Sequence, residues 1–166
     1  MARSGVENAI GQGLLAIGLF TVAFESMLLE FRAKMHAYVR RADPENELAF
    51  LKSCKTAFGT FSYCGSKLVQ LGILADSDLE TLSNLRERRN AFTHRGFDYL
   101  LALRVRDLEQ DLQVLQSIAA KVEQWRPATS DGFEQDEEVQ FSISPAIGYR
   151  FAKVVAERLA DEVLTV

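Results

Sequence analysis

The feature that most constrains the fold is a long apolar repeat near the start of the chain. Between residues 10 and 38, side chains that are apolar in all but one case recur in alternating steps of four and three: Ile10, Leu14, Ile17, Thr21, Phe24, Leu28, Phe31, Met35 and Tyr38. A period of about 3.5 residues is typical of a helix that packs along its length against another helix. The repeat therefore predicts a long first helix and a fold in which helices pack on helices. This helix should end near Arg41, because Asp43-Pro44 has the pattern of an N-cap and first turn of the next helix.

Three more helical patterns follow this repeat, over residues 44–71, 77–96 and 98–126. The expected core positions of the first of them are Leu48, Leu51, Phe58, Phe61, Leu68 and Leu71. Gly72 is placed to end that helix, and Gly96 to end the next one. Ser77 and Glu80 have the spacing of a capping box, which marks a helix start. Short connections between helices predict an all-α fold, an antiparallel bundle of four to five helices, over residues 1–126.

The character of the chain changes after residue 126. Residues 127–144 include an acidic, polar stretch, and then Val139, Phe141 and Ile143 alternate with polar residues. This pattern predicts a solvated loop with one possible short strand. Residues 145–166 again have helical periodicity, so we expect a last helix that packs on the bundle or on a dimer. Together these parts predict a single domain.

Composition and charge exclude several classes of protein. The chain has 166 residues, of which 48% are hydrophobic, so a disordered protein is excluded. Its net charge of −4 argues against a protein that coats nucleic acid, because such proteins are usually basic. Residues 8–24 carry no charge, but the apolar repeat continues through Glu25, Glu30 and Arg32, as in a core helix. We therefore expect a cytoplasmic protein with no membrane association.

The two cysteines and two histidines suggest no metal site. Cys54 and Cys64 are ten residues apart in one predicted helix, which would separate them by about 15 Å and exclude a disulfide. Neither His36 nor His94 has zinc-ligand spacing from a cysteine. We predict two buried thiols in a reducing compartment, a structural or surface role for His36, and no metal or cofactor.

The residues that suggest chemistry lie between 85 and 96. Four arginines and one glutamate give residues 86–95 a charge of +3, so the rest of the chain sums to −7. These arginines surround His94, and an imidazole exchanges protons near neutral pH while guanidinium groups bind phosphate. This pairing is what RNA cleavage without a metal requires. The alternative is a solvated, arginine-rich helix end that is stabilised by the helix dipole.

Arg89-Asn90-x3-His94, followed by Arg95 and Gly96, resembles the Arg-polar-x3-His signature of the HEPN superfamily. The resemblance covers about residues 6–126 and implies a small all-α bundle. Many HEPN proteins are metal-independent endoribonucleases that act as toxins or antiviral effectors. Their two signature segments meet across a homodimer interface to form one cleft. The resemblance therefore implies RNA as substrate and a second copy as partner, with an antitoxin or operon partner protein as a further candidate partner.

The roles carried over from this family are specific. His94 would be the catalytic acid or base, Arg89 the contact to phosphate and transition state, and Asn90 the residue that orients His94. The family often adds an acidic residue near this arginine, for which Glu25 is the first candidate and Glu30 the second. Further contacts to RNA phosphate are expected from Arg86, Arg88 and Arg95.

Two other interpretations stay open at this point. A non-catalytic HEPN module that binds RNA, a nucleotide or a protein partner would use the same fold and the same basic segment. A helical scaffold with no role in nucleic-acid binding is the third possibility.

Overall fold

The computed structural model describes residues 2–102 and 105–125, which form helices joined by short connections. The α-helices are α1 (Ala2–Ala42), α2 (Glu47–Ser53), α3 (Ala57–Gln70), α4 (Asp76–Ala102) and α5 (Val105–Gln124), and a 3-10 turn, η1 (Pro44–Asn46), precedes α2. No strand occurs among the described residues, and the predicted all-α bundle is confirmed. The predicted acidic loop and strand at 127–144 and the predicted helix at 145–166 lie outside them.

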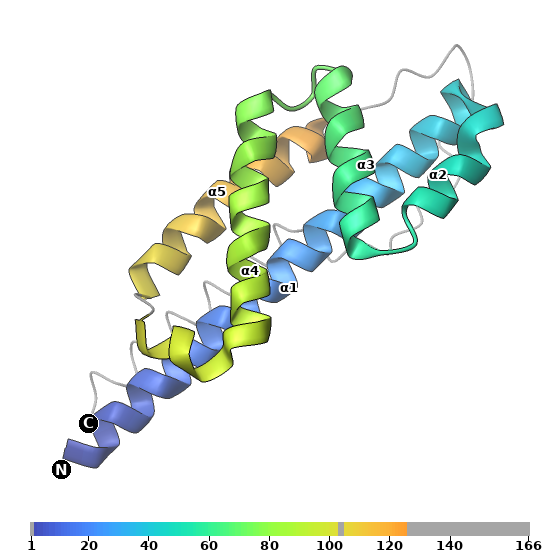
Figure 1. Ribbon diagram of the computed structural model, residues 1–166. Helices are drawn as coiled ribbons and strands as arrows, with labels where there is room; N and C mark the ends of the chain where they lie inside the picture. Colours follow the sequence, from blue (N-terminus) through green and yellow to red (C-terminus); the bar gives the residue numbers. More distant parts are fainter. Residues whose placement is uncertain (1, 103–104, 126–166) are drawn as a thin grey trace.

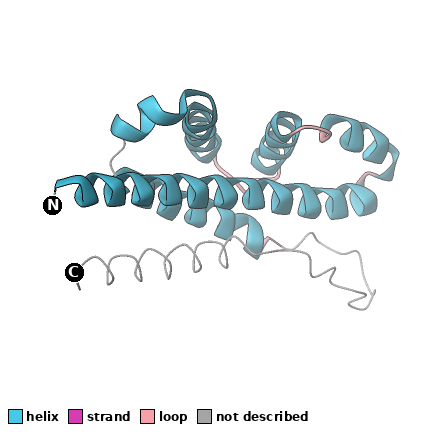
Figure 2. Ribbon diagram, turned by 90° about the horizontal axis from the view of Figure 1, so that it is seen from below, coloured by secondary structure: helices cyan, strands magenta, loops and turns pink. Residues whose placement is uncertain are grey.

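Helix α1 is the spine of the fold, because all four other α-helices contact it. Figure 2 shows it as a long rod with shorter helices lying across and alongside it. The predicted end of this helix near residue 41 is confirmed. Its buried face is wider than the predicted repeat, since it also includes Phe20, Ala23, Met27 and Val39. By contrast Leu14, which belongs to the repeat, is 56% exposed.

Successive helices reverse direction, so α1 and α5 lie side by side and point the same way (Figure 1). The Lys34 ammonium of α1 donates to the Val122 carbonyl at 2.8 Å and to the Trp125 carbonyl at 3.3 Å. The ring of Tyr38 also contacts Trp125, with 5.6 Å between ring centroids. A cation at the last carbonyls of a helix satisfies free acceptors and complements the dipole. These contacts hold the end of α5 on α1.

The predicted continuous helix over 44–71 is wrong, because the chain breaks at residues 54–56 and reverses. Thr56 has extended backbone angles, and its hydroxyl accepts a hydrogen bond from the Gly59 N–H at 3.0 Å. This is an N-cap, so α3 starts as a new helix there. The start of α3 packs against the end of α2, and a Cβ at Gly59 would lie 2.0 Å from the Ser53 carbonyl oxygen.

The reversal changes which side chains are buried. Leu48 and Phe58, both expected in the core, are 72% and 64% exposed. Cys54 lies in the break after α2 and Cys64 lies in α3. The reversal brings their sulfurs to 3.9 Å from each other, instead of the expected separation of about 15 Å. Both thiols are free and buried, as predicted, and burial raises the pKa of each of them.

The connection from α3 to α4 contains one position whose backbone conformation favours glycine. Gly72 has a φ of +70°, and its N–H donates to the Val69 carbonyl at 2.9 Å. The Ile73 N–H donates to the Leu68 carbonyl at the same distance. This pair of bonds is the Schellman motif that ends helices at glycine. The predicted role of Gly72 as a helix stop is therefore confirmed.

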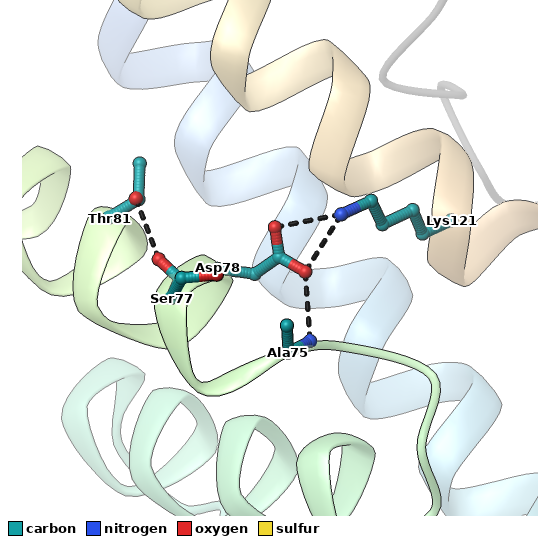
Figure 3. Close-up of polar contacts among 5 residues, drawn as sticks. All are labelled: Ala75, Ser77, Asp78, Thr81 and Lys121. Atoms are coloured by element: carbon teal, nitrogen blue, oxygen red, sulfur yellow. Dashed lines mark hydrogen bonds and ion pairs between the residues drawn. The ribbon is translucent and has the colours of Figure 1, made fainter.

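The predicted capping box of Ser77 and Glu80 is wrong, because α4 begins at Asp76. Its cap is made by Asp78, whose carboxylate accepts from the Ala75 N–H at 2.9 Å (Figure 3). Lys121 of α5 donates to both oxygens of the same carboxylate at 2.8 Å. Asp78 therefore caps α4 and ties it to α5 at the same time.

Helix α4 continues through Gly96 to Ala102, so the predicted end at Gly96 and the predicted start of the next helix at Asp98 are wrong. A glycine inside a helix costs about 1 kcal/mol relative to alanine. Continuing the helix retains the backbone hydrogen bonds of another turn, and in this chain that outweighs the preference of glycine. The next helix, α5, begins only at Val105.

By length and composition, residues Gly13–Ala42 of α1 could cross a membrane, with a mean hydropathy of 1.8 in the apolar window. A third of that window is buried inside the structure. Core helices of soluble proteins and N-terminal signal sequences meet the same criterion. The absence of membrane association and the cytoplasmic location stay predictions.

The close approach at Gly59 predicts a large effect of a single methyl group. Gly59→Ala should lower the free energy of unfolding by about 1–3 kcal/mol, because the backbone of α2 or α3 must shift. Gly18→Ala is the matched control, since a Cβ at Gly18 meets nothing within 4 Å. The control should stabilise the protein by about 1 kcal/mol or leave it unchanged. Urea denaturation of both variants measures the difference, and equal stabilities would contradict the described turn.

The contacts of Asp78 predict a pH-dependent contribution to stability. Burial alone would raise the pKa of Asp78, but the hydrogen bonds from Lys121 and the Ala75 N–H outweigh it and lower the pKa. A lowered pKa in the folded state contributes stability above the unfolded value of about 3.9, and that stability is lost as the pH falls through the folded value.

We therefore expect Asp78→Asn to destabilise the protein by about 1 kcal/mol at pH 7 and by much less near pH 3. Asp76→Asn is the control, because Asp76 is exposed on the same helical turn. Denaturation at both pH values measures the effect. A loss that is the same at both pH values would contradict the role of the Asp78 carboxylate.

Candidate functional site

The centre of the candidate site lies where α4 crosses α1 (Figure 1). The Arg89 guanidinium of α4 forms an ion pair with the Glu25 carboxylate of α1. It also donates to the Asn90 side-chain oxygen at 3.0 Å. The Arg89 side chain is 26% exposed and that of Glu25 is 36% exposed. Glu25, Arg89 and Asn90, called the Arg89 cluster below, thus form one contiguous polar group at the protein surface.

Local sequence explains why these groups meet. Glu25 follows the buried Phe24 and lies about 100° from it around α1, at the edge of the buried face. On α4, Arg89 lies four residues after the buried Leu85 and three before the buried Phe92, whose ring packs edge-on against Phe20 of α1. The apolar contacts between the two helices therefore bring the carboxylate and the guanidinium together at the rim of the core.

Glu30, the second acidic candidate, is not near Arg89. It lies five residues after Glu25, which places it about 140° further around α1. Burial raises the pKa of Glu30, whereas Lys34 lowers it and Glu123 of α5 raises it further. Its environment is thus the side of α1 that faces α5.

His94 is exposed, and none of the described residues forms a hydrogen bond with it. Because α4 is continuous, His94 and Arg89 point about 140° apart, and a helix end at Gly96 does not bring them together. Asn90 lies between them, within about 40° of His94 around the helix. Its side-chain oxygen accepts from Arg89 and not from His94. The structure therefore joins Arg89, Asn90 and Glu25, and places His94 on the neighbouring exposed sector.

The remaining arginines of the basic segment are divided between different sides of α4. Arg88 forms an ion pair with Asp111 of α5. On an ideal helix, Arg88 lies about 160° around α4 from Asn90. Burial raises the pKa of Asp111, although the charge of Arg88 opposes this. Arg95 is exposed and lies on the same side as Arg88, within about 20° of it. The phosphate-binding roles of Arg88 and Arg95 stay predictions, and neither residue is part of the Arg89 cluster.

Arg86 lies one turn before Arg89, on the same side of α4. Its guanidinium carbon is 5.0 Å from the centroid of the Phe58 ring and 4.8 Å from that of Phe61, both on α3. The Arg86 Nε is buried without a hydrogen-bond partner among the described residues. Phe58 is exposed whereas Phe61 is buried, so Arg86 bridges the core and an exposed ring.

Phe58 is a residue of this site that sequence reasoning missed. The apolar spacing of a continuous helix assigned it to the core. The signal that could have exposed the error is Thr56, a good N-cap residue three positions before Gly59. A helix start at that point places Phe58 in the first turn, where side chains often remain accessible.

The other histidine has a structural role, as predicted. The His36 Nε2 lies 2.8 Å from the Glu47 carboxylate, and its ring stacks on Phe50 at 5.4 Å with an angle of 9° between the planes. These contacts join α1 to α2. Within the described parts of the chain, no group of three or more His, Cys, Asp or Glu side chains has the arrangement of a metal site.

Comparison with protein families, curated proteins and solved structures gives no match to this chain. The resemblance to the HEPN superfamily therefore depends on the signature residues themselves.

Proposed function

We propose that this protein is a metal-independent endoribonuclease of the HEPN type that cleaves RNA in a composite site between two copies of the chain. The observation that carries the proposal is the Arg89 cluster, with the exposed His94 one turn further along the same helix. A fixed guanidinium from one copy and an exposed imidazole from the other would supply the two groups that phosphodiester cleavage needs.

The chemistry assigns a step to each side chain. An imidazole of His94 takes the proton of a ribose 2′-hydroxyl, and the freed oxygen attacks the adjacent phosphorus. Arg89 stabilises the negative charge that develops on the phosphate oxygens. The bond to the 5′-oxygen breaks, and a protonated imidazole donates the proton to that oxygen. The products are a 2′,3′-cyclic phosphate and a 5′-hydroxyl, with no net consumption of protons.

Glu25 and Asn90 position Arg89 in this scheme. The ion pair and the amide contact hold the guanidinium at the surface before RNA binds, which reduces the ordering cost of binding. The Arg89 guanidinium can bind phosphate through two hydrogen bonds. Its ion pair with the partly exposed Glu25 carboxylate contributes little stability, because exposed ion pairs are weak. RNA can therefore share or replace the contact to Glu25.

The proposal requires a second copy, because Arg89 and His94 of one chain point about 140° apart. Helix α1 offers a surface for it beside the site. Leu14, Val22 and Leu29 are 56%, 55% and 65% exposed, and on an ideal helix they fall within about 80° of one another, in the sector that contains Glu25. Exposed apolar side chains next to a polar site are typical of a protein interface. In the proposed dimer, a second copy seated on this surface supplies its own His94 to the Arg89 cluster.

The role of His94 can be tested with unstructured RNA as substrate. His94→Ala should reduce the cleavage rate at least about 100-fold, because the proton-transfer group is lost. Arg89→Ala should have an effect of similar size, since the charge on phosphate is no longer stabilised. His36→Ala is the control for histidine loss and should retain activity. Circular dichroism of each variant confirms folding, and EDTA should not affect the unmodified protein.

Activity that survives His94→Ala, or that requires Mg²⁺, would contradict this mechanism. RNA binding without cleavage by the unmodified protein would favour the non-catalytic binding module instead.

The proposed dimer makes a separate prediction. Val22→Glu together with Leu29→Glu should give a monomer without cleavage activity, because two charges would be buried at the interface. Leu48→Glu is the control, since Leu48 is 72% exposed on α2, away from this face of α1. Sedimentation equilibrium gives the mass of each variant. A single-chain mass for the unmodified protein at micromolar concentration would contradict the composite site.

A further inference from the structure

We propose that Phe58 is a stacking platform for an unpaired nucleobase of the RNA, so that the site takes single-stranded substrates. This inference rests on the proposed function and extends it, because it names the form of RNA that the site accepts.

The first observation is the exposure of the ring. Among the phenylalanines whose side chains the structure describes, Phe58 is 64% exposed and the others are buried. The other large exposed apolar side chains of the described parts of the chain are aliphatic. Phe58 is therefore the one phenyl ring in this set with a surface available to a planar ligand.

The second observation is that the ring is held in place. The Arg86 guanidinium lies between Phe58 and the buried Phe61, at 5.0 Å and 4.8 Å from the ring centroids. The backbone beside Phe58 is also fixed, because Gly59 packs directly against Ser53 and its N–H bonds to the Thr56 hydroxyl. A ring that is already oriented loses little freedom when a base stacks on it.

The third observation is the charge next to the ring. Arg86 places a guanidinium against Phe58, and Arg89 follows one turn later on α4. An aromatic ring with adjacent cations is the combination that binds single-stranded nucleic acids, with the ring contacting a base and the cations contacting the backbone. Residues 86–95 carry +3 whereas the rest of the chain sums to −7, so the sequence concentrates positive charge in this segment.

The position of the ring relative to the proposed chemistry also fits. Arg86, which contacts Phe58, is three residues before Arg89 on the same helix, or about 4.5 Å along its axis. A short stretch of extended RNA can span that length. A base can reach a protein ring in this way only when it is not paired, because paired bases are stacked inside the helix.

The test uses the full-length His94→Ala protein, which should bind RNA without cutting it. Fluorescence anisotropy measures its affinity for a labelled single-stranded oligoribonucleotide. Phe58→Leu in this background should weaken binding about 5- to 150-fold, the range expected for loss of one stacked base. Phe58→Trp should restore binding, whereas Leu48→Ala, an exposed apolar residue of α2, should leave it unchanged.

A second arm removes the base instead of the ring. Oligoribonucleotides with one abasic nucleotide at successive positions should reveal a position at which base loss weakens binding to the protein that retains Phe58. At that position, the loss should have no further effect on the Phe58→Leu protein, because the two partners of one contact are coupled. A fully paired duplex of the same sequence should bind with no dependence on Phe58.

The outcomes separate the two proposals. Oligonucleotide binding that is indifferent both to Phe58→Leu and to every abasic position overturns the stacking platform and leaves the proposed nuclease intact. Failure of the His94→Ala and unmodified proteins to bind or cut any RNA overturns both.

Discussion

The burial of one face of α1 is the interaction on which the rest of the structure depends. Its largest members, Phe20, Phe24, Met27, Phe31 and Met35, are almost completely buried against the other helices. Each such side chain contributes about 1.5–3 kcal/mol of burial free energy. The polar contacts of the fold lie around this core: the Arg89 cluster is at one edge, and Lys34 fixes the end of α5 at another. The position of the candidate site is thus a result of apolar packing, not of its own ion pair.

Local patterns predicted two helix ends correctly, whereas the helix stop predicted at Gly96 and the capping box predicted at Ser77 were wrong. The end of α1 near Arg41 followed from the Asp43-Pro44 pattern, and the end of α3 followed from the need for a positive φ at Gly72. The break at residues 54–56 could not be seen in the same way, because the apolar spacing continues through it. What decides the break is the Thr56 cap together with the contact between Gly59 and Ser53, and the second of these is a tertiary contact.

The residues of the candidate site could likewise be predicted only in part. The resemblance to the HEPN superfamily implied an acidic partner for Arg89 with Glu25 as the first candidate, and the structure places the two in contact. The sequence could not show that Arg88 pairs with Asp111, because that contact depends on the register of α5 against α4. Phe58 was assigned to the core because one continuous helix was predicted over residues 44–71. The chain instead reverses before α3, and this reversal changes which face of α3 contacts α1.

Adjacent arginines that bind two different helices have a mechanical consequence. Arg88 attaches α4 to α5 and Arg89 attaches it to α1, on sides of the helix about 100° apart. Two ion pairs in different directions resist rotation of α4 about its own axis. Since His94 lies on the same helix, these ion pairs, together with the apolar contacts of α4, influence the direction in which its imidazole points. High salt concentrations weaken partly exposed ion pairs but not the apolar core. The orientation of the His94 side chain would therefore become more variable at salt concentrations at which the protein is still folded.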